Sequence, residues 1–311
     1  MEGVTLITIP WWVFEIATVA MLLGFGALAI ESAVKMKERS ARRILWGIVG
    51  ALALFGWGVI FYGSFIEPKR LQVVEREVVL SEKVEHQVRV AVISDYHAGP
   101  YKNARSMERV VQKVNGLKVD MVWSPGDFIF NNTEQVEMLE PLSRYEAPIY
   151  ASTGNHDHEF ADVEAVVDRL EAFGVSVLRN ESTLVEGQDG GRLNIVGIDD
   201  IWFSPNPPAA LAKVDPDAPV VVIVHNPDFI LDPYAKEADL VISGHTHGGQ
   251  IRLPWIGPVP PLPTKLGRAY DRGVFGFGEE GTLFITQGVG ETGPRARLFA
   301  RPTIDVLTIR Y

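Results

Sequence analysis

The sequence has no cysteine among its 311 residues. This absence excludes disulfide bonds, thiolate zinc sites and cysteine nucleophiles together. Basic residues are also scarce, with 29 Lys and Arg against 39 Asp and Glu. Residues 1–71 hold seven basic and five acidic side chains, so residues 72–311 carry 22 basic and 34 acidic ones, a net charge of −12. An acidic domain of this kind repels a phosphate backbone, so we expect no general binding of nucleic acid.

Two long apolar stretches lie near the N-terminus, at Trp11–Ile30 and Ile44–Phe65, and the second contains no charged residue. Each has roughly the 20 residues that a helix needs to cross the hydrocarbon layer of a membrane. A cleaved signal peptide would begin with basic residues and end at a cleavage site with small residues. Here the chain begins Met1-Glu2-Gly3, and a second full-length apolar stretch follows. We therefore predict two retained spans and a multi-pass protein of the inner or plasma membrane.

The short segment between the two spans predicts their orientation. Residues 35–43 include five basic side chains, and such loops stay on the cytoplasmic side. A two-span hairpin then places the rest of the chain outside the cytoplasm, although Lys69 and Arg70 after the second span reduce the charge asymmetry. The predicted division of the chain is a transmembrane hairpin with its connector at residues 1–71 and one globular domain at residues 72–311.

Strand and helix patterns alternate in the predicted globular domain. Short apolar runs predict strands, and apolar residues at helical spacing predict helices. The predicted strands are 88–94, 120–124, 149–153, 193–198, 220–224, 240–243, 282–286 and 303–309, and the predicted helices are 105–115, 134–144 and 161–173. Strands replace helices toward the C-terminus, which does not fit one simple parallel sheet. The apolar, proline-rich segment Leu253–Leu262 is either a lid that faces lipid or a packed loop.

Five of the seven histidines lie in short loops directly after predicted strands. These loops read Ser94-Asp95-Tyr96-His97, Pro125-Gly126-Asp127, Gly154-Asn155-His156-Asp157, His225-Asn226-Pro227 and Gly244-His245-Thr246-His247-Gly248-Gly249-Gln250. Because strand ends of an α/β fold meet along one edge, we expect two Asp, one Asn and five His in one place. Such a cluster needs cations, and two divalent ions about 4 Å apart would satisfy it and support hydrolysis. Imidazole, carboxylate and amide ligands without thiolate suit Mn²⁺, Fe or Zn²⁺.

The ordered motifs resemble those of the calcineurin-like metallophosphoesterases, and the resemblance covers roughly residues 72–311. It implies a four-layer αββα sandwich of two mixed sheets and a two-metal site that hydrolyses phosphodiester or pyrophosphate bonds. The first metal would be held by Asp95, His97 and His247, the second by Asn155, His225 and His245, with Asp127 as the bridge between them. His156 would contact the substrate phosphate and protonate the leaving oxygen. Phe130 stands where many relatives have Asp or Asn, which leaves the bridging Asp127 unaffected.

Three further residues are candidates for substrate binding: His158, Arg295 and Arg297. His158 adjoins the Gly-Asn-His-Asp loop, and the two arginines, with Arg301 nearby, follow a predicted strand end and could clamp an anion. Solvated arginines are the simpler alternative. Asp157 is expected to orient its loop rather than to bind metal. Any single histidine is more often a satisfied surface or core residue than a ligand, so the prediction depends on the ordered set.

A narrower resemblance concerns the substrate. The two spans, the Ile66-Glu67-Pro68-Lys69 connector and the Gly-Gly-Gln-Ile-Arg-Leu-Pro sequence at residues 248–254 resemble bacterial transmembrane metallophosphoesterases. That group includes membrane phosphodiesterases, cell-wall enzymes and a UDP-diacylglucosamine pyrophosphatase, which implies a phosphorylated lipid-like or nucleotide-sugar substrate at the bilayer. No obligate protein partner is evident. Two alternatives stay open: a non-enzymatic membrane scaffold or sensor, and a cyclic-nucleotide phosphodiesterase with the same metal motifs and a different pocket.

Overall fold

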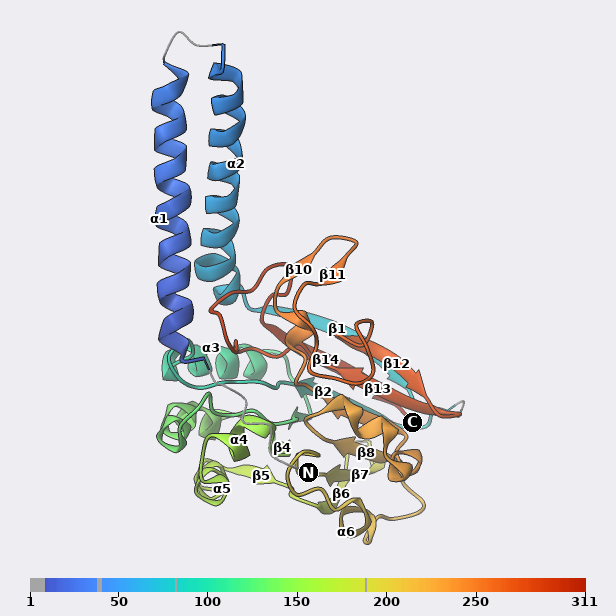
Figure 1. The fold of residues 1–311 in the computed structure, drawn as a ribbon. Coiled ribbons are helices and arrows are strands. Elements are labelled where there is room, and N and C mark those ends of the chain that lie inside the picture. The colour runs from blue at the N-terminus through green and yellow to red at the C-terminus, as the bar shows by residue number, and fades with distance from the viewer. Residues whose placement is uncertain (1–8, 38–40, 82, 188) are drawn as a thin grey trace.

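The protein consists of a long helical hairpin joined to a globular domain (Figure 1). The computed structural model describes residues 9–37, 41–81, 83–187 and 189–311. Helix α1 spans Trp11–Met36 and helix α2 spans Arg43–Phe61, and the two lie side by side. Both helices are long and apolar enough to cross a membrane, as the sequence predicted. Residues 38–40 of the basic segment, and the first three residues of the chain, lie outside the described residues.

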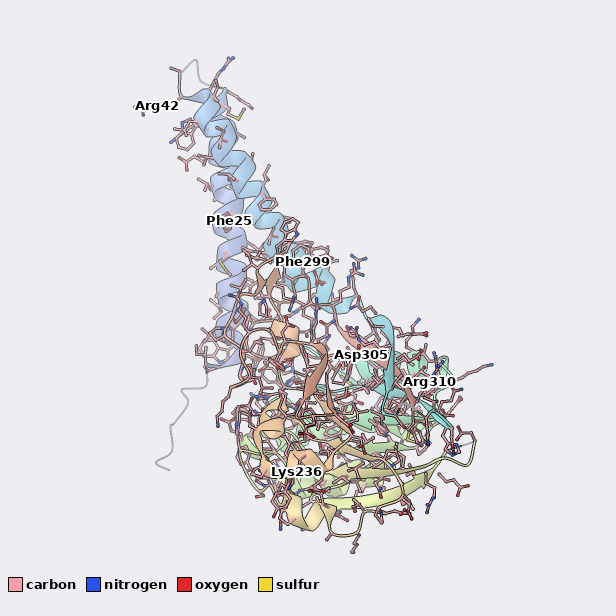
Figure 2. All side chains as sticks on the ribbon, turned by 90° about the vertical axis from the view of Figure 1, so that its right-hand side faces the viewer. Phe25, Arg42, Lys236, Phe299, Asp305 and Arg310 are labelled. Atoms are coloured by element: carbon pink, nitrogen blue, oxygen red, sulfur yellow. The ribbon has the colours of Figure 1, made fainter. Side chains whose placement is uncertain are left out.

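The hairpin is fixed to the domain through the end of α2. This helix continues into a π-helical turn, η1 at Tyr62–Ile66, and a 3-10 turn, η2 at Glu67–Lys69. The carbonyl oxygen of Gly63 accepts a hydrogen bond from the N–H of Arg297 at 2.9 Å. The carboxylate of Glu67 accepts one from the N–H of Ala300 at 2.8 Å. Figure 2 shows Arg42 at the far end of the hairpin and Phe299 where the hairpin meets the domain. The connector is therefore part of the folded domain surface.

Two six-stranded mixed sheets form the centre of the domain. The first sheet has the order β1 (Gln72–Val79), β14 (Thr303–Arg310), β2 (Gln87–Val92), β3 (Met121–Ser124), β4 (Ile149–Ala151) and β5 (Val175–Val177). The second has the order β12 (Gly273–Phe277), β13 (Gly281–Ile285), β9 (Leu240–Ser243), β8 (Val220–Ile223), β7 (Arg192–Gly197) and β6 (Glu181–Glu186). Strands β2 to β5 run parallel, as do β7, β8, β9 and β13. A separate short hairpin pairs β10 (Arg252–Leu253) with β11 (Gly257–Pro258).

Helices cover the outer face of each sheet. Those that pack on the first sheet are α3 (Ala104–Asn115), the 3-10 helix η3 (Thr133–Arg144) and α5 (Val163–Ala172), and the short helix α4 (Asn155–Glu159) lies between β4 and α5 along the chain. Those on the second are α6 (Pro207–Leu211) and the 3-10 turns η4 (Pro227–Leu231) and η5 (Pro233–Glu237). A further 3-10 turn, η6, spans His247–Gly249. The predicted helix at 134–144 is a 3-10 helix because Pro141 within it has no N–H for an α-helical hydrogen bond.

Alternating side chains along the strands divide the interior into three cores. Between the two sheets lie Trp123 of β3 and Phe284 of β13, both fully buried. On the outer face of the first sheet, Leu170 of α5 is buried against the strands. On the outer face of the second, Ala210 of α6 and Phe229 of η4 are buried. The layers are therefore helix, sheet, sheet and helix, which is the sandwich that the resemblance implied.

Candidate metal centre

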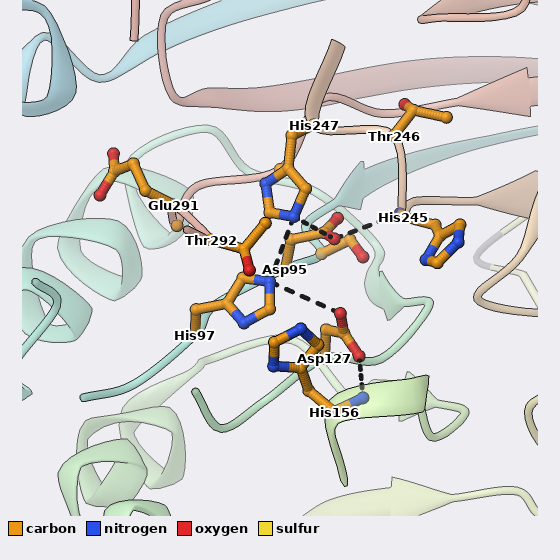
Figure 3. Close-up of polar contacts among 12 residues, drawn as sticks. Asp95, His97, Asp127, His156, His245, Thr246, His247, Glu291 and Thr292 are labelled. Atoms are coloured by element: carbon orange, nitrogen blue, oxygen red, sulfur yellow. Dashed lines mark hydrogen bonds and ion pairs between the residues drawn. The ribbon is translucent and has the colours of Figure 1, made fainter. Parts of the chain in front are cut away.

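Five loops at strand ends form a polar cluster, and Figure 3 shows its members Asp95, His97, Asp127, His156, His245 and His247. Asp95 and His97 follow β2, Asp127 follows β3, Asn155 and His156 begin α4 after β4, His225 follows β8, and His245 and His247 follow β9. Strands β2, β3 and β4 are parallel neighbours in one sheet, and β8 and β9 in the other, so their C-terminal ends meet along one rim. The structure places all seven predicted ligands and His156 at this rim.

One half of the cluster consists of Asp95, His97 and His247. The Nε2 of His247 lies 3.3 Å from Oδ1 of Asp95 and 3.2 Å from Nε2 of His97. All three side chains are buried, and their ligand atoms lie within 4.8 Å of one another. The Nε2 of His97 also lies 3.5 Å from Oδ2 of Asp127, which connects this half to the other. A divalent ion can be held by these three side chains.

Asp127 contacts residues from both sheets. Its Oδ2 lies 3.1 Å from Nε2 of His225, whose Nε2 lies 3.1 Å from Nδ1 of His245. Its Oδ1 accepts a hydrogen bond from the backbone N–H of His156 at 2.9 Å. Asn155, directly before His156, is also buried. A carboxylate that meets histidines on two sides has the position required to bridge two cations.

Backbone carbonyl groups determine which ring nitrogen stays available on three of the histidines. Nδ1 lies 3.3 Å from Ile129 O in His97, 2.6 Å from Phe130 O in His156 and 2.7 Å from Pro125 O in His225. A carbonyl oxygen can only accept, so each Nδ1 carries a proton and each Nε2 faces the cluster. Metal-binding imidazoles are oriented by the same kind of hydrogen bond to the opposite nitrogen.

The backbone of the cluster adopts an unusual conformation. Five of the seven predicted ligands have positive φ: Asp95 at 53°, His97 at 43°, Asp127 at 56°, His245 at 69° and His247 at 52°. Residues other than glycine seldom adopt this region, and each instance costs of order 1–3 kcal/mol unless the surroundings compensate. Such strain concentrates at functional sites, where the position of a side chain matters more than local stability.

Two glycines permit the close approach of the loops. A Cβ atom on Gly154 would overlap Oδ1 and the backbone nitrogen of Asp127. A Cβ atom on Gly244 would overlap the Ser94 hydroxyl and approach Oδ2 of Asp95 to 2.6 Å. Neither glycine needs a positive φ, so the reason for glycine here is space beside the carboxylates.

Burial and the charges of neighbouring side chains shift the pKa values of the cluster residues. Burial raises the pKa of Asp95 to about 6, and the Asp127 charge acts in the same direction. Burial alone would lower the pKa of His225, but the charge of Asp127 and its hydrogen bond raise it to about 10. Burial and neighbouring histidines lower the pKa of His97 and that of His245 to about 3. These two imidazoles are therefore neutral at pH 7, the state in which a ring nitrogen can bind a cation.

Several polar atoms of the cluster are buried without a partner in the described part of the chain. They are Oδ2 of Asp95, Oδ1 of Asn155 and Nδ1 of His247. In addition, Nε2 of His97 faces Nε2 of His247 at 3.2 Å. Buried acceptors without donors are costly, and cations between them remove that cost. The donor set of nitrogen and oxygen atoms thus fits divalent metal ions.

The three predicted substrate-binding residues lie outside the cluster. Nε2 of His158 pairs with Oδ1 of Asp199 at 2.6 Å, and the ring stacks on Phe203. Arg295 lies 3.7 Å from Glu15 of α1. None of the three lines the cavity above the cluster.

Arg297 is fully buried, and its guanidinium group forms hydrogen bonds to backbone carbonyl groups before and after it in the same loop. It donates to the carbonyl oxygens of Gly290, Ala300 and Gln287 and lies 3.4 Å from the carboxylate of Glu291. Burial lowers the pKa of Arg297 from its usual value, and the Glu291 charge opposes this shift. These contacts fix the conformation of residues 287–300, and the N–H groups of Val289 and Gly290 in that loop donate to the carbonyl oxygens of Ser94 and Asp95.

Two acids complete the surroundings of the cluster. Asp157 accepts hydrogen bonds from the N–H groups of Phe128 and Gly154, both at 2.9 Å, so it orients the loops as expected. Asp200 is fully buried after β7, with Oδ2 unpaired among the described residues. Burial raises its pKa to about 6, and His225 and Asp127 lie close enough to influence it. Asp200 was not among the residues predicted from the sequence, although it follows a predicted strand in the same way as Asp95 and Asp127.

A cavity of about 640 Å³ lies above the cluster, with Asp127, Asn155, His156, His245 and His247 at its polar side. Pro263 lines it, but no residue of Leu253–Leu262 does, so this segment is not a lid over the cavity in this conformation. The segment instead contributes most of the β10–β11 hairpin, which lies on the side of the domain that faces the helical hairpin (Figure 1). Trp255, in the turn between these strands, is fully exposed.

Removal of divalent ions with EDTA is expected to lower the thermal midpoint of the detergent-solubilised protein. Mn²⁺ at 100 times its dissociation constant would add about 2.7 kcal/mol of stability, roughly 5–10 °C for a chain of this size. Because burial raises the pKa of Asp95 to about 6, protons compete with the ion below that pH, and the difference in midpoint should shrink there. Calorimetry on both sides of pH 6 measures it. An equal difference in an Asp95→Ala protein would mean that the ions act elsewhere.

Comparisons with known proteins agree with this geometry. Residues 88–249 match the calcineurin-like phosphoesterase family. The uncharacterized metallophosphoesterase YkuE of Bacillus subtilis is 30% identical, covering 88% of this chain and 99% of YkuE. The phosphodiesterase YaeI of Escherichia coli is 27% identical, over 87% and 99% of the two chains. The UDP-2,3-diacylglucosamine pyrophosphatase LpxG of Chlamydia trachomatis is 26% identical, over 80% and 92%. This chain therefore belongs to the calcineurin-like phosphoesterases and is a phosphoester hydrolase.

Proposed function

We propose that this protein is a membrane-anchored, two-metal hydrolase of phosphodiester or pyrophosphate bonds. Its substrate would be a lipid-linked or nucleotide-sugar phosphate of the membrane or envelope. The observation that carries this proposal is the buried cluster at the joint rim of the two sheets, where Asp127 contacts histidines of both. The relatives named phosphodiesterase and pyrophosphatase support the same class of reaction.

The proposed roles follow the two halves of the cluster. Asp95, His97 and His247 would hold one ion, Asn155, His225 and His245 the other, and Asp127 both. Mn²⁺, Fe and Zn²⁺ all accept this mixture of imidazole, carboxylate and amide ligands. When bound, such ions lower the pKa of water and stabilise negative charge on phosphoryl oxygens. The chain itself supplies the geometry, since carbonyl hydrogen bonds orient the rings of His97, His156 and His225 and the loops around them are buried.

His156 is the proposed catalytic acid. Its Nδ1 is held by the carbonyl oxygen of Phe130, and its backbone N–H is held by Asp127. The ring also lines the cavity, 4.4 Å from the ring of His97 between centroids. Its Nε2 can therefore hold a proton at the cavity side and deliver it to the departing oxygen. The contact with His156 uses the backbone carbonyl of Phe130 and not its side chain. It can therefore form with Phe at this position, where many relatives have Asp or Asn.

We also propose the membrane location. The two helices would anchor the protein as a multi-pass component of the inner or plasma membrane, with residues 72–311 outside the cytoplasm. Lys35, Arg42 and Arg43 lie at the end of the hairpin farthest from the domain, which supports this orientation (Figure 2). The exposed Trp255 of the β10–β11 hairpin suits the interface between lipid and water.

A substrate panel tests this function against its alternatives. The full chain, loaded with Mn²⁺ in detergent, is assayed with an aryl phosphodiester, a nucleotide-sugar pyrophosphate, a phosphomonoester and cyclic AMP. We expect turnover of the diester or the pyrophosphate, at least about tenfold above the monoester. A protein with two bound ions and no turnover of any substrate would instead be a scaffold or sensor. A strong preference for cyclic AMP would favour the cyclic-nucleotide alternative.

A further inference from the structure

One wall of the cavity above the metal cluster is made by the first membrane helix. Ile9, Pro10, Trp11 and Phe14, at and before the start of α1, line the cavity together with the polar residues of the cluster. The remaining apolar lining consists of Phe130, Phe160, Trp202 and Pro263. The metal-binding end of the cavity is thus continuous with an aromatic surface that begins on α1.

With α1 embedded in a bilayer, its start would lie at the depth where lipid head groups meet acyl chains. This helix has 26 residues, which at a rise of about 1.5 Å each gives a length of roughly 39 Å. The hydrocarbon layer is only about 30 Å thick. Lys35 marks the far end of the helix, so the first turns extend beyond the hydrocarbon on the side of the domain. Trp11 in this turn is half exposed, as expected for an interfacial aromatic residue.

The start of α1 is also held in a fixed position relative to the metal cluster. The Tyr101 hydroxyl lies 3.3 Å from the backbone oxygen of Trp11 and 3.2 Å from that of Gly293. The rings of Tyr101 and Trp11 also meet edge to face. In the same loop as Gly293, the N–H of Gly290 donates to the carbonyl oxygen of Asp95 at 2.6 Å. The wall is therefore joined to the metal cluster through this short series of contacts.

The charges around the cavity limit the kind of molecule that fits it. Among the described residues, the cavity lining contains no Lys or Arg, and Glu159 adds a negative charge near its edge. A nucleotide with several phosphate groups would find no cationic side chain there. A single phosphodiester at the metal cluster, with a hydrocarbon chain against the aromatic wall, satisfies both ends of the cavity.

We propose that the first turn of α1 is part of the substrate site and selects amphiphilic phosphodiesters from the bilayer. The phosphate would lie at the metal cluster, and the hydrocarbon chain would pass Phe14 and Trp11 into the membrane. This inference rests on the hydrolytic function proposed above. It assigns to α1 a role in specificity in addition to anchoring.

Two chromogenic esters with the same leaving group test the inference: p-nitrophenyl methyl phosphate and p-nitrophenyl hexadecyl phosphate. Burial of apolar area favours the long chain, and we expect kcat/KM of the full chain in detergent to be at least about tenfold higher for it. In Phe14→Ala and Trp11→Ala proteins this ratio should fall toward one. Trp12→Ala is the matched control, because Trp12 belongs to the same turn, is exposed and does not line the cavity.

Phe160→Ser provides a second variant outside the membrane helix, in case a change in α1 disturbs insertion, and its ratio should also fall. Partition of the long ester into micelles affects the Trp12→Ala protein equally, so it cannot produce the difference. Equal hydrolysis of both esters by the unaltered protein, or an unchanged ratio in the Phe14 and Phe160 variants, would overturn this inference alone. Turnover of a nucleotide-sugar pyrophosphate with hydrolysis of neither ester would also overturn this inference alone. Hydrolysis of neither the esters nor the pyrophosphate by protein with two bound ions would overturn the proposed function and this inference with it.

Discussion

Replacement of Asp127 by Asn is expected to lower kcat for a phosphodiester by at least about 10³-fold, or roughly 4 kcal/mol of transition-state stabilisation. Asp127 is the carboxylate that contacts His97 on one side and His225 on the other, and its Oδ1 also fixes the backbone of His156. Loss of the negative charge weakens the binding of both ions. It also weakens the hydrogen bond that positions the backbone of His156, the proposed acid. Steady-state kinetics with saturating Mn²⁺, together with metal analysis of the purified protein, measures the effect.

Asp120→Asn is the matched control for this substitution. Asp120 also lies beside β3, at its other end, and accepts a hydrogen bond from the N–H of Arg89 at 2.7 Å. This contact concerns the packing of strands and not the metal cluster, so kcat should change less than about threefold. If the Asp127→Asn protein kept more than a tenth of the activity with both ions bound, the bridging role would be wrong.

The two carboxylates of the metal cluster, Asp127 and Asp95, respond differently to pH. The attraction of His225 and His156 outweighs the effect of burial and holds the pKa of Asp127 well below its usual range. Asp127 is therefore still ionised at pH values where Asp95, whose pKa is raised to about 6, takes up a proton. Below about pH 6, protonation of Asp95 therefore adds to the competition between protons and ions, beside the proton that His225, whose pKa is raised to about 10, must release to bind an ion. The stability test with EDTA compares pH values on both sides of 6 because the Asp95 step falls there.

The metal cluster could be predicted from sequence because each part of it is local. A buried run such as 240–243 predicts a strand, and a polar residue directly after it must lie at the edge of the sheet. This rule predicts His245 and His247. Because the strands before the separate loops run parallel, their C-terminal ends bring those loops together at one edge. Asp200 obeys the same rule after β7 and was missed because no histidine accompanies it in the segment Gly197-Ile198-Asp199-Asp200.

Other features could not be read from the sequence. Strand β1 has the sequence QVVEREVV, in which charged residues interrupt the apolar run, since it is an edge strand paired only with β14. Phe14 lines the same cavity as Asp127, although the two residues are more than a hundred positions apart in the sequence. In an apolar membrane helix, no sequence signal distinguishes a residue that faces lipid from one that faces the domain. The buried position of Arg297 likewise depends on carbonyl groups that only the folded loop brings together.

Replacement of His156 by Ala is expected to lower kcat by about 10²–10³-fold for an alkyl phosphodiester and by less than about tenfold for a nitrophenyl ester. The nitrophenolate group departs without a proton, whereas an alkoxide requires one. The substitution leaves the backbone N–H that donates to Asp127 in place, so the bridging carboxylate keeps this contact. Comparison of kcat for the two esters separates loss of a proton donor from general damage to the site.

Metal analysis of the His156→Ala protein distinguishes the two roles that the geometry allows for this ring. His156 lies with His97 and Asp127 in a group whose ligand atoms are within 4.8 Å of one another, so it could also bind an ion. A proton donor leaves two ions per chain after the substitution, but a ligand does not. His86→Ala is the control, because His86 lies beside Asp189 at 3.6 Å, far from the cluster in the fold. Retention of two ions with an equal loss for both esters would assign His156 to phosphate binding, and the departing oxygen would then take its proton from solvent.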